Sequence, residues 1–324
     1  MSDRSLSFWV TAPGCGEIRQ APLASAGVGE LMVQALFSGV SRGTESLVFN
    51  GNVPPSEYTR MRAPFQDGDF PTPVKYGYCM VGRVVHGPDD YRGRDVFCLH
   101  PHQDRFVVPV SAVHPLPSDV PAARAVLAAN METALNGLWD AGVLPGDRIS
   151  VIGAGSVGCL TAWLAARIPG CEVELIDINP RRAGIACDLG AQFALPDAAR
   201  GEADVVIHAS GTQAGISLAL KLAAFEATVV ELSWYGDRSV SLSLGEAFHS
   251  RRLNLKSSQV GNVASARRAR RTLQSRMQLA LSLLNDAALD GLINSESRFA
   301  DLPRTMHQLC NAPGDAIMHR VRYD

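Results

Sequence analysis

Apolar residues follow two different patterns along the chain, a β-rich one first and an alternating one after it. Up to about residue 128, short runs of β-forming residues are separated by clusters of glycine and proline. Strands are predicted at Leu6–Val10, Glu30–Leu36, Met80–Val85, Asp95–Leu99 and Arg105–Val108. A long loop at Gly51–Val74, rich in proline, glycine and charge, is expected to rim a cleft. This first part is typical of a small barrel-like β domain.

From about residue 129 to 260, strand and helix patterns alternate. After two apolar runs at 149–152 and 173–176 come a predicted strand at Ala203–His208, a helix through Gly215–Ala224 and a strand at Ala227–Leu232. This rhythm predicts an α/β fold with a doubly wound parallel sheet. In the remainder, 261–324, the pattern predicts helices at about Ala264–Asn285 and Leu302–Cys310 and a last strand at Ala316–Arg322.

The most informative motif joins the first of these apolar runs to a helix-length segment. It has the form Gly-x-Gly-x-x-Gly. Gly153 allows a tight turn, Gly155 lets the backbone approach a pyrophosphate, and Gly158 lets the helix pack close to the strand. The helix opening at Ser156 and Val157 would point free N–H groups and its positive dipole end at the phosphates. The motif therefore predicts a dinucleotide site.

Asp177 follows the second apolar run, about 20 residues after the glycines. There a carboxylate can accept hydrogen bonds from the adenosine ribose hydroxyls and repel a 2′-phosphate, which favours NAD(H). Arg181 and Arg182 could instead pair with that phosphate. We predict NAD as the cofactor, with NADP the less favoured alternative.

Length, charge and cysteine content indicate the class of protein and disfavour some binding partners. A chain of 324 residues suits two domains, and a net charge of −2 gives no general attraction to nucleic acid or membrane. The basic cluster Arg267–Arg271 is expected to be the solvated start of a helix. Seven cysteines without a C-x-x-C pair predict reduced thiols. Because no apolar stretch reaches membrane length and no signal peptide is evident, we predict a cytoplasmic protein.

Several phrases along almost the whole chain resemble the medium-chain dehydrogenase/reductase family. They are Ser38–Glu45, Lys75–Gly82, Glu132-Thr-Ala, Ala141–Gly146, the glycine motif and the closing phrase Ala287–Ile293. The resemblance implies a GroES-like catalytic domain at 1–128, a Rossmann domain at 129–260 and a return to the catalytic domain at 261–324. It also implies hydride transfer between a nicotinamide and an alcohol, a carbonyl or a carbon–carbon double bond, in a cleft between the domains. A homodimer joined through edge strands of the nucleotide-binding sheets is expected.

Zinc-dependent members of that family carry Cys-Gly-x-Asp, Gly-His-Glu and a third Cys or Glu ligand. The matching positions here hold Arg42, Tyr78 and Ala129, which cannot bind zinc. The four-cysteine structural zinc loop is also missing. His100 and His102 have the spacing of one face of a strand, but no acidic or sulfur partner is evident. We predict that the protein binds no metal.

Without a metal, the substrate oxygen needs a proton donor or a fixed cation during hydride transfer. Tyr78 could donate or accept the proton, Arg42 could stabilise an alkoxide or bind a substrate carboxylate, and Glu45 could pair with Arg42. Alternatively, an Arg42–Glu45 ion pair fills the vacated metal cavity with Tyr78 beside it. Thr133 matches the family residue beside the nicotinamide, or else caps a helix. His102 could move protons, but a hydrogen bond to a loop carbonyl is favoured.

Other residues are expected near the cofactor because of the resemblance. Ser210 and Gly211 match the turn near the cofactor ribose, and Arg182 matches a ribose-contacting cation. Backbone at Gln259–Gly261 is placed near the nicotinamide. The alternatives are an ordinary strand-to-helix loop for the first pair and a domain linker for the last segment.

The Ser-Arg-Gly-Thr-Glu phrase and the missing zinc ligands are similar to the branch of the bacteriochlorophyllide hydroxyethyl dehydrogenases. This favours a secondary alcohol or ketone as a small-molecule substrate. A zinc-independent NADPH quinone or enone reductase is the alternative enzyme, and Asp177 disfavours it. A dinucleotide-binding protein without catalysis is the alternative from another class.

Overall fold

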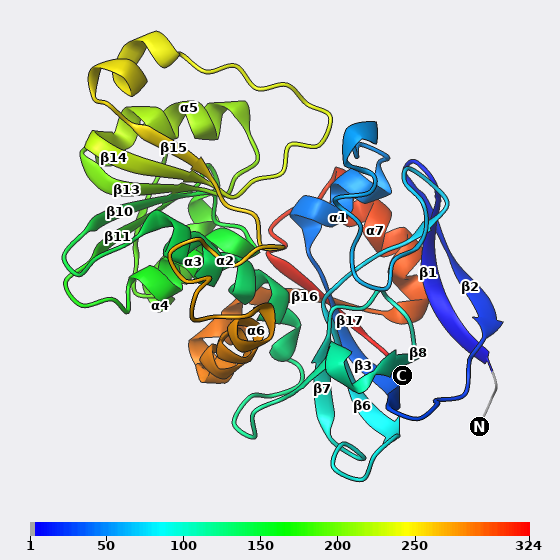
Figure 1. Cartoon of the computed structure of the whole chain (residues 1–324). Helices are drawn as coiled ribbons and strands as arrows, with labels where there is room; N and C mark the ends of the chain where they lie inside the picture. Colours follow the sequence, from blue (N-terminus) through cyan, green and yellow to red (C-terminus); the bar gives the residue numbers. More distant parts are fainter. Residues whose placement is uncertain (1–3) are drawn as a thin grey trace. The chain divides into compact units, whose positions relative to one another are not determined.

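The computed structural model describes residues 4–324, which form two compact units (Figure 1). The first unit combines the described residues up to Ala129 with Leu281–Asp324, and the second is Asn130–Ala280. The chain thus re-enters the first unit at residue 281, some way after the tail was predicted to begin at 261.

The first unit contains two sheets. The smaller has the order β2-β1-β5-β4, and its strands are β1 (Arg4–Ala12), β2 (Cys15–Pro22), β4 (Asp67–Gly68) and β5 (Val74–Lys75). The larger has the order β16-β17-β3-β6-β7-β9, with β8 paired to β3. Its strands are β3 (Glu30–Val40), β6 (Met80–His86), β7 (Asp95–Cys98), β8 (Arg105–Pro109), β9 (Val113–Pro115), β16 (Ile293–Arg298) and β17 (Met318–Arg322).

Alternation of apolar and polar residues makes these strands two-sided. In β3, Leu31, Val33 and Ala35 are buried while the residues between them are partly exposed. They pack with Met80, Val96 and Phe106 from the neighbouring strands in one hydrophobic core. The five strands predicted in this region are confirmed.

The second unit is built on a six-stranded parallel sheet with the order β12-β11-β10-β13-β14-β15. Its strands are β10 (Arg148–Ile152), β11 (Glu172–Ile176), β12 (Gln192–Ala194), β13 (Ala203–His208), β14 (Ala223–Glu231) and β15 (Asn254–Ser257). The central strands are almost continuously apolar, as expected for a sheet covered on both faces. Chain order reverses between β10 and β13, so the predicted doubly wound α/β sheet is confirmed.

Helices of both units lie between or after the strands. They are α1 (Arg42–Phe49), α2 (Ala128–Ala141), α3 (Ser156–Ala165), α4 (Ala183–Asp188), α5 (Gln213–Leu222), α6 (Leu273–Ser282) and α7 (Leu302–Asn311). Short 3₁₀ turns lie at Pro55–Glu57, Val110–Ala112, Ala125–Leu127, Pro180–Arg182, Leu283–Asn285, Ala287–Leu292 and Phe299–Asp301, with a kinked π turn at Leu244–Phe248. In Figure 1, α3 and α4 cover one face of the parallel sheet and α5 the other, as right-handed crossovers in opposite directions require.

The predicted helix at Ala264–Asn285 is wrong over its first third. Residues 265–270 form turns, and α6 begins only after Thr272. There Ser275 N–H donates to Thr272 Oγ1, and Thr272 N–H donates to Ser275 Oγ, which is a reciprocal cap. Arginines three and four residues apart in Arg267–Arg271 would repel one another on a helix, so this segment stays outside it.

Two smaller differences concern β structure. The predicted helix Gly215–Ala224 begins at Gln213 and ends at Leu222, because Ala223 and Ala224 already belong to β14. The strand β16 was not predicted, since its polar sequence gave no apolar alternation. Within residues 4–324, every helix is too short or too polar to cross a bilayer.

Candidate functional site

The glycine motif forms a tight turn at the carboxyl end of β10. Gly153 has a φ of +103°, and a Cβ there would lie 2.8 Å from the backbone nitrogen of Ser210. A Cβ on Gly158 would lie 1.8 Å from the carbonyl oxygen of Gly153. A Cβ on Gly155, in contrast, would have no neighbour within 4 Å. Two glycines are therefore required by packing, while the third borders open space where a phosphate group would fit.

The helix that follows supplies the donors. Gly155 is the N-cap of α3, and Ser156 and Val157 form its first turn. N–H groups of a first helical turn have no partner within the helix and attract anions. The turn and the helix end together fit the diphosphate of a dinucleotide.

Asp177 directly follows β11 and is tied to the glycine turn. One carboxylate oxygen accepts a hydrogen bond from Ala154 N at 2.7 Å, and the other accepts from Asn179 N at 2.9 Å. Each oxygen keeps a second lone-pair site, so a ribose hydroxyl can still be bound. Of the two neighbouring arginines, Arg182 is buried and Arg181 is exposed, which leaves Arg181 as the cation nearer to solvent.

Ser210 and Gly211 form the turn between β13 and α5. Ser210 lies against Gly153, and Gly211 N–H donates to Ser233 Oγ at 3.0 Å. Gln259 lies beyond β15, where its side chain accepts from Gly261 N. Thr133 lies within α2, five residues after its start, so the alternative role of helix N-cap is wrong.

Glu45 is the centre of the polar site in the first unit. It lies in the first turn of α1, is 3% exposed, and accepts a hydrogen bond from Ser41 N at 2.7 Å. Its other oxygen lies 2.9 Å from His102 Nε2. An acidic residue at a helix start is favoured by the helix dipole. Arg42 begins the same helix, and its predicted ion pair with Glu45 stays a prediction.

His102 has a different environment from the one predicted. The sequence favoured a loop carbonyl as its partner, but Nε2 faces Glu45 and Nδ1 lies 2.7 Å from Ser38 Oγ. Ser38 Oγ is in turn 3.0 Å from the hydroxyl of Tyr323. His102 and Tyr323 lie far along the chain from Ser38 and Glu45, so no motif spacing indicated that these four residues meet. We call Ser38, Glu45, His102 and Tyr323 the Glu45 network.

Tyr78 is connected to the Glu45 network through Ser41. Burial raises the pKa of Tyr78 well above its usual range, and nearby Tyr76, Cys79 and Glu45 raise it further, whereas a hydrogen bond with Ser41 opposes the rise. The pKa of the neighbouring Cys79 thiol is also raised well above normal, by burial first and then by Glu45. Both groups therefore hold their protons at neutral pH, so the Tyr78 phenol can donate a hydrogen bond.

The three positions that correspond to zinc ligands do not fit a zinc ion. Arg42 and Tyr78 carry a guanidinium and a protonated phenol, and Ala129 is a buried methyl group. Zinc in proteins takes thiolate, imidazole or carboxylate ligands. Among residues 4–324, three or more side chains of His, Cys, Asp or Glu nowhere gather as a metal site would require.

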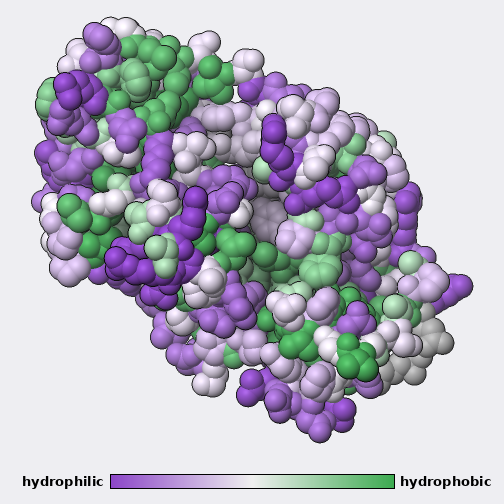
Figure 2. Space-filling view, viewed as in Figure 1, coloured by the Kyte–Doolittle hydropathy of each residue, from purple (hydrophilic) through white to green (hydrophobic). Residues whose placement is uncertain are grey.

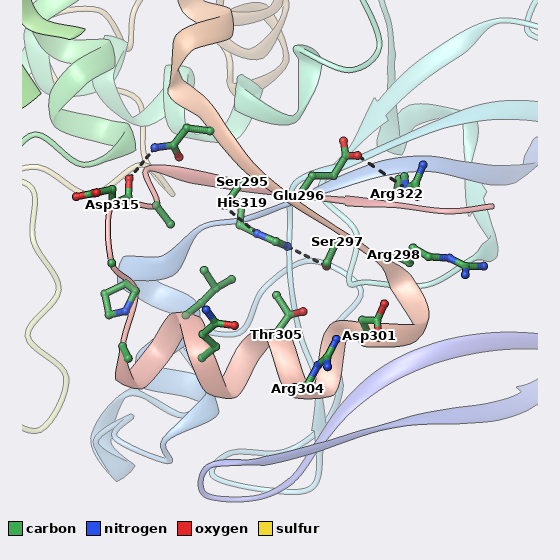
Figure 3. A pocket seen from close by; sticks show the side chains of 17 residues that line it. Ser295, Glu296, Ser297, Arg298, Asp301, Arg304, Thr305, Asp315, His319 and Arg322 are labelled. Atoms are coloured by element: carbon green, nitrogen blue, oxygen red, sulfur yellow. Dashed lines mark hydrogen bonds and ion pairs between the residues drawn. The ribbon is translucent and has the colours of Figure 1, made fainter. Parts of the chain in front are cut away.

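A polar cavity of about 890 Å³ lies elsewhere in the first unit (Figure 3). It is lined by β16, α7, β17 and the loop before β17, and it contains none of the predicted catalytic residues. On its floor the ring of His319 lies between Ser295 Oγ and Ser297 Oγ, at 3.0 and 2.9 Å. Burial lowers the pKa of His319 to about 4, so this ring is neutral at pH 7.

No family model matches the sequence. It is 24% identical over 259 residues to D-guloside 3-dehydrogenase of Escherichia coli K12, covering 68% of this chain and 71% of that protein. A dehydrogenase of Sinorhizobium meliloti 1021 that is described as zinc-binding and is bound to NADP superposes with a TM-score of 0.80 at 17% identity, covering 99% of this chain and 100% of that one. The chain has the fold of the alcohol-dehydrogenase-like oxidoreductases.

A further solved structure has the same fold and contains NADH in place of NADP. An alcohol dehydrogenase of Escherichia coli CFT073, complexed with NADH, has a TM-score of 0.78 at 14% identity over 99% of this chain and 100% of its own. The predicted fold class, a GroES-like β-rich domain with a Rossmann domain, is confirmed. The similarity to the bacteriochlorophyllide branch stays a prediction.

Proposed function

We propose that this protein is an oxidoreductase that transfers hydride between NAD(H) and a secondary alcohol or ketone without a catalytic zinc ion. The observation that carries the proposal is the glycine turn at Gly153–Gly158, tied to Asp177 at the switch point of a dehydrogenase fold. Similar proteins are named for dehydrogenation of alcohols and sugars, which supports a small hydroxylated or carbonyl substrate.

The bound nicotinamide would supply or accept the hydride. Gly153, Gly155, Ser156, Val157 and Gly158 would bind its diphosphate, and Asp177 would bind the adenosine ribose. On the substrate side, Tyr78 would donate a proton to the carbonyl oxygen as the hydride arrives at carbon. Its raised pKa keeps the phenol protonated at neutral pH, which is the donor form that reduction of a ketone requires. We propose that Thr133 lies beside the nicotinamide ring of the cofactor.

The Glu45 network would hold Tyr78 in place. Glu45 fixes the Ser41 backbone, and Ser41 bonds to the Tyr78 hydroxyl. Arg42, at the start of the same helix, would stabilise negative charge on the substrate.

NAD(H) is the proposed cofactor over NADP(H), although similar structures hold either one. Two ionised groups about 4 Å apart repel by roughly 4 kcal/mol at a near-surface dielectric. A solvent-exposed pair such as Arg181 with a 2′-phosphate returns about 1 kcal/mol or less. The repulsion from Asp177 therefore outweighs the attraction. Arg182, Ser210, Gly211 and Gln259 are proposed as further cofactor contacts.

The proposal is tested by incubating the purified protein with NADH or NADPH and panels of ketones, quinones and enones. Oxidation of NADH with ketones alone supports it. Turnover of quinones or enones with NADPH would mean a zinc-independent reductase, and saturable NADH binding without any turnover would mean a binding protein without catalysis.

A homodimer remains part of the proposal. The strand β15 lies at the edge of the parallel sheet, and large exposed hydrophobic residues lie on or near it at Phe225, Leu244 and Leu255. Figure 2 shows hydrophobic residues gathered on this part of the second unit, over α5 and β14. Light scattering after size exclusion should give twice the mass of 34.6 kDa, and a monomer would refute the dimer. A cytoplasmic location also stays a prediction.

A further inference from the structure

The polar cavity between β16, α7 and β17 has no part in the proposed function (Figure 3). Its volume of about 890 Å³ lies within the roughly 300–1,000 Å³ that is usual for small-molecule sites. The loop before β17 is tied to β16 by the side-chain amide of Asn294, which donates to the carbonyl oxygen of Asp315 at 2.6 Å and accepts from Ile317 N at 2.8 Å. The helix α7 is anchored by three buried residues, Leu302, Met306 and Leu309. The walls of the cavity are therefore held in place by the unit itself.

The charged side chains that line this cavity balance one another. They are three arginines and three acidic residues: Arg298, Arg304, Arg322, Glu296, Asp301 and Asp315. Some of them are paired within the lining. Arg304 Nη2 lies 3.4 Å from Asp301 Oδ1, and Arg322 Nε lies 3.8 Å from Glu296 Oε1. A lining with equal numbers of both charges gives no net attraction to an anion or a cation, so the cavity favours a neutral ligand.

The floor of the cavity is a buried histidine that is bonded to two serines. The ring of His319 is 6% exposed, with Nδ1 3.0 Å from Ser295 Oγ and Nε2 2.9 Å from Ser297 Oγ. Burial lowers the pKa of His319 to about 4, so at pH 7 the neutral ring has one N–H donor and one acceptor nitrogen. One serine must therefore donate its hydrogen to the ring, and the other must accept from it. This is true of either tautomer.

Both serines consequently offer hydrogen-bonding groups to a ligand. The serine that accepts from the ring still has its own hydrogen to donate, and the serine that donates to the ring still has lone pairs that can accept. On the wall formed by α7, Thr305 and Gln308 can each donate and accept, and their side chains make no hydrogen bond to another residue in the described part of the chain. Figure 3 shows Thr305 pointing from α7 toward the ring of His319. A ligand with several hydroxyl groups can pair with all of these groups, whereas an ionised phosphate or carboxylate can only accept.

We propose that this cavity binds a neutral polyhydroxylated small molecule, that is, a sugar or a polyol. Ser295, Ser297 and Thr305 would contact the ligand, and His319 is the positioning residue that fixes the two serine hydroxyl groups. The site shares no residue with the dinucleotide turn or the Glu45 network, so the inference goes beyond the proposed function and does not depend on it.

Three ligands that share a cyclohexane ring separate the effect of hydroxyl groups from that of charge. They are myo-inositol, cyclohexanol and myo-inositol monophosphate, and calorimetry would give their dissociation constants with the full chain. We expect myo-inositol to bind at least about tenfold more tightly than cyclohexanol, because it can form two or more further hydrogen bonds. The phosphate ester should bind no more tightly than myo-inositol. Absence of myo-inositol binding, tighter binding of the phosphate ester or equal binding of cyclohexanol would each overturn the inference.

The location of the ligand is measured on the ring nitrogens of the histidines in protein labelled with ¹⁵N. The signals of His319 are identified by their loss in His319→Gln. Saturating myo-inositol should shift these signals, whereas those of His307, an exposed histidine of α7 outside the cavity lining, should not move. A shift of the His102 signals without a shift of the His319 signals would place the polyol at the candidate active site and would refute the proposed site.

Two substitutions, Ser297→Ala and Thr305→Val, each remove one hydroxyl group from a different wall of the cavity. Each should weaken myo-inositol binding about three- to tenfold, as expected for the loss of one neutral hydrogen bond. The control Thr59→Val changes an exposed threonine of the same unit outside the cavity and should bind myo-inositol as the wild type does. An unchanged dissociation constant in either cavity variant would overturn the assignment.

The positioning role of His319 has a separate readout. His319→Phe keeps a ring of similar size but can bond to neither serine, whereas the amide in His319→Gln can still bond to one of them. We expect the preference for myo-inositol over cyclohexanol to fall in His319→Phe and to be largely kept in His319→Gln. Equal losses of affinity for both ligands in both variants would indicate a merely structural role and would refute the positioning role.

Discussion

In the proposed mechanism, Tyr78 is a proton donor at a position where the zinc-dependent members of the similar family carry a metal ligand. A zinc ion would polarise a substrate oxygen as a Lewis acid. In the proposed mechanism the Tyr78 phenol, which its raised pKa keeps protonated, would instead donate to that oxygen. The neighbouring Glu45 network would keep the phenol oriented without itself reacting.

Replacing Tyr78 by phenylalanine should therefore lower kcat for ketone reduction by about 10²–10⁴-fold, because general acid catalysis is lost. KM for NADH should change little, since the cofactor residues lie in the other unit. Because the pKa of Tyr78 is raised, its proton is retained through pH 10, and wild-type reduction should not fall between pH 7 and 10 from loss of that proton. The control Tyr91→Phe should be fully active, and an unchanged kcat in Tyr78→Phe would remove Tyr78 from the mechanism.

Asp177 is the second decisive residue, through its charge. Wild-type protein should bind NADH at least about tenfold more tightly than NADPH at one ionic strength, from a net repulsion of roughly 2–3 kcal/mol. Asp177→Ser should narrow or reverse this ratio, while Asp188→Ser, which changes an exposed aspartate of the same unit, should preserve it. Tighter binding of NADPH by the wild type contradicts the cofactor assignment.

At the scale of elements, the turn between β10 and α3 contains one glycine that packing requires and another that we expect only the ligand to require. Gly158→Ala places a Cβ 1.8 Å from a carbonyl oxygen and should destabilise the fold by about 1–3 kcal/mol. Gly155→Ala meets no atom within 4 Å, so the melting temperature should hold while NADH affinity falls. Thermal melting and NADH titration of the two variants give the comparison. Normal NADH binding by a folded Gly155→Ala would show that no ligand approaches this turn.

The elements differ in how well the sequence predicts them. Apolar strands such as β13 were predicted with their observed bounds, because continuous burial leaves an unambiguous apolar run. The polar strand β16 was missed, since it lies at a sheet edge and its pairing with β17 depends on residues about 25 positions later. The helix at 264–285 was predicted too long. The periodicity of apolar residues shows neither the charge repulsion among the arginines nor the cap at Thr272.

The candidate site was predictable only where its residues are close in sequence. The glycine turn and Asp177 follow from local spacing. The contacts of His102 with Glu45 and Ser38 join two segments that are far apart in the chain, and no spacing predicts them. The contact between His208 and Glu231, 2.7 Å from Nδ1 to Oε2, could have been expected, since both are polar residues at the carboxyl ends of adjacent apolar strands.

For the molecule as a whole, buried neutral histidines should make stability depend on pH. The pKa of His319 is lowered by burial from 6.5 to about 4, so the folded state binds fewer protons than the unfolded state between these values. The free energy of unfolding is therefore unaffected by His319 above pH 6.5 and falls by on the order of 3 kcal/mol as the pH decreases towards 4, because the unfolded state takes up the proton first. Urea unfolding from pH 7 to 4 should show a shallower decline for His319→Gln, whereas exposed His307→Gln should follow the wild type. Parallel curves for wild type and His319→Gln would contradict this origin.

For the whole molecule, the central proposal is hydride transfer without a zinc ion. The most direct measurement uses NADH carrying deuterium in its transferable position, a panel of ketones and protein dialysed against chelator, with zinc quantified in the same sample. We expect deuterium on the carbinol carbon of the product at well under one zinc per chain, with the rate unchanged when zinc is added. Turnover that appears only with added zinc, or a stoichiometric metal that survives dialysis, would contradict the account.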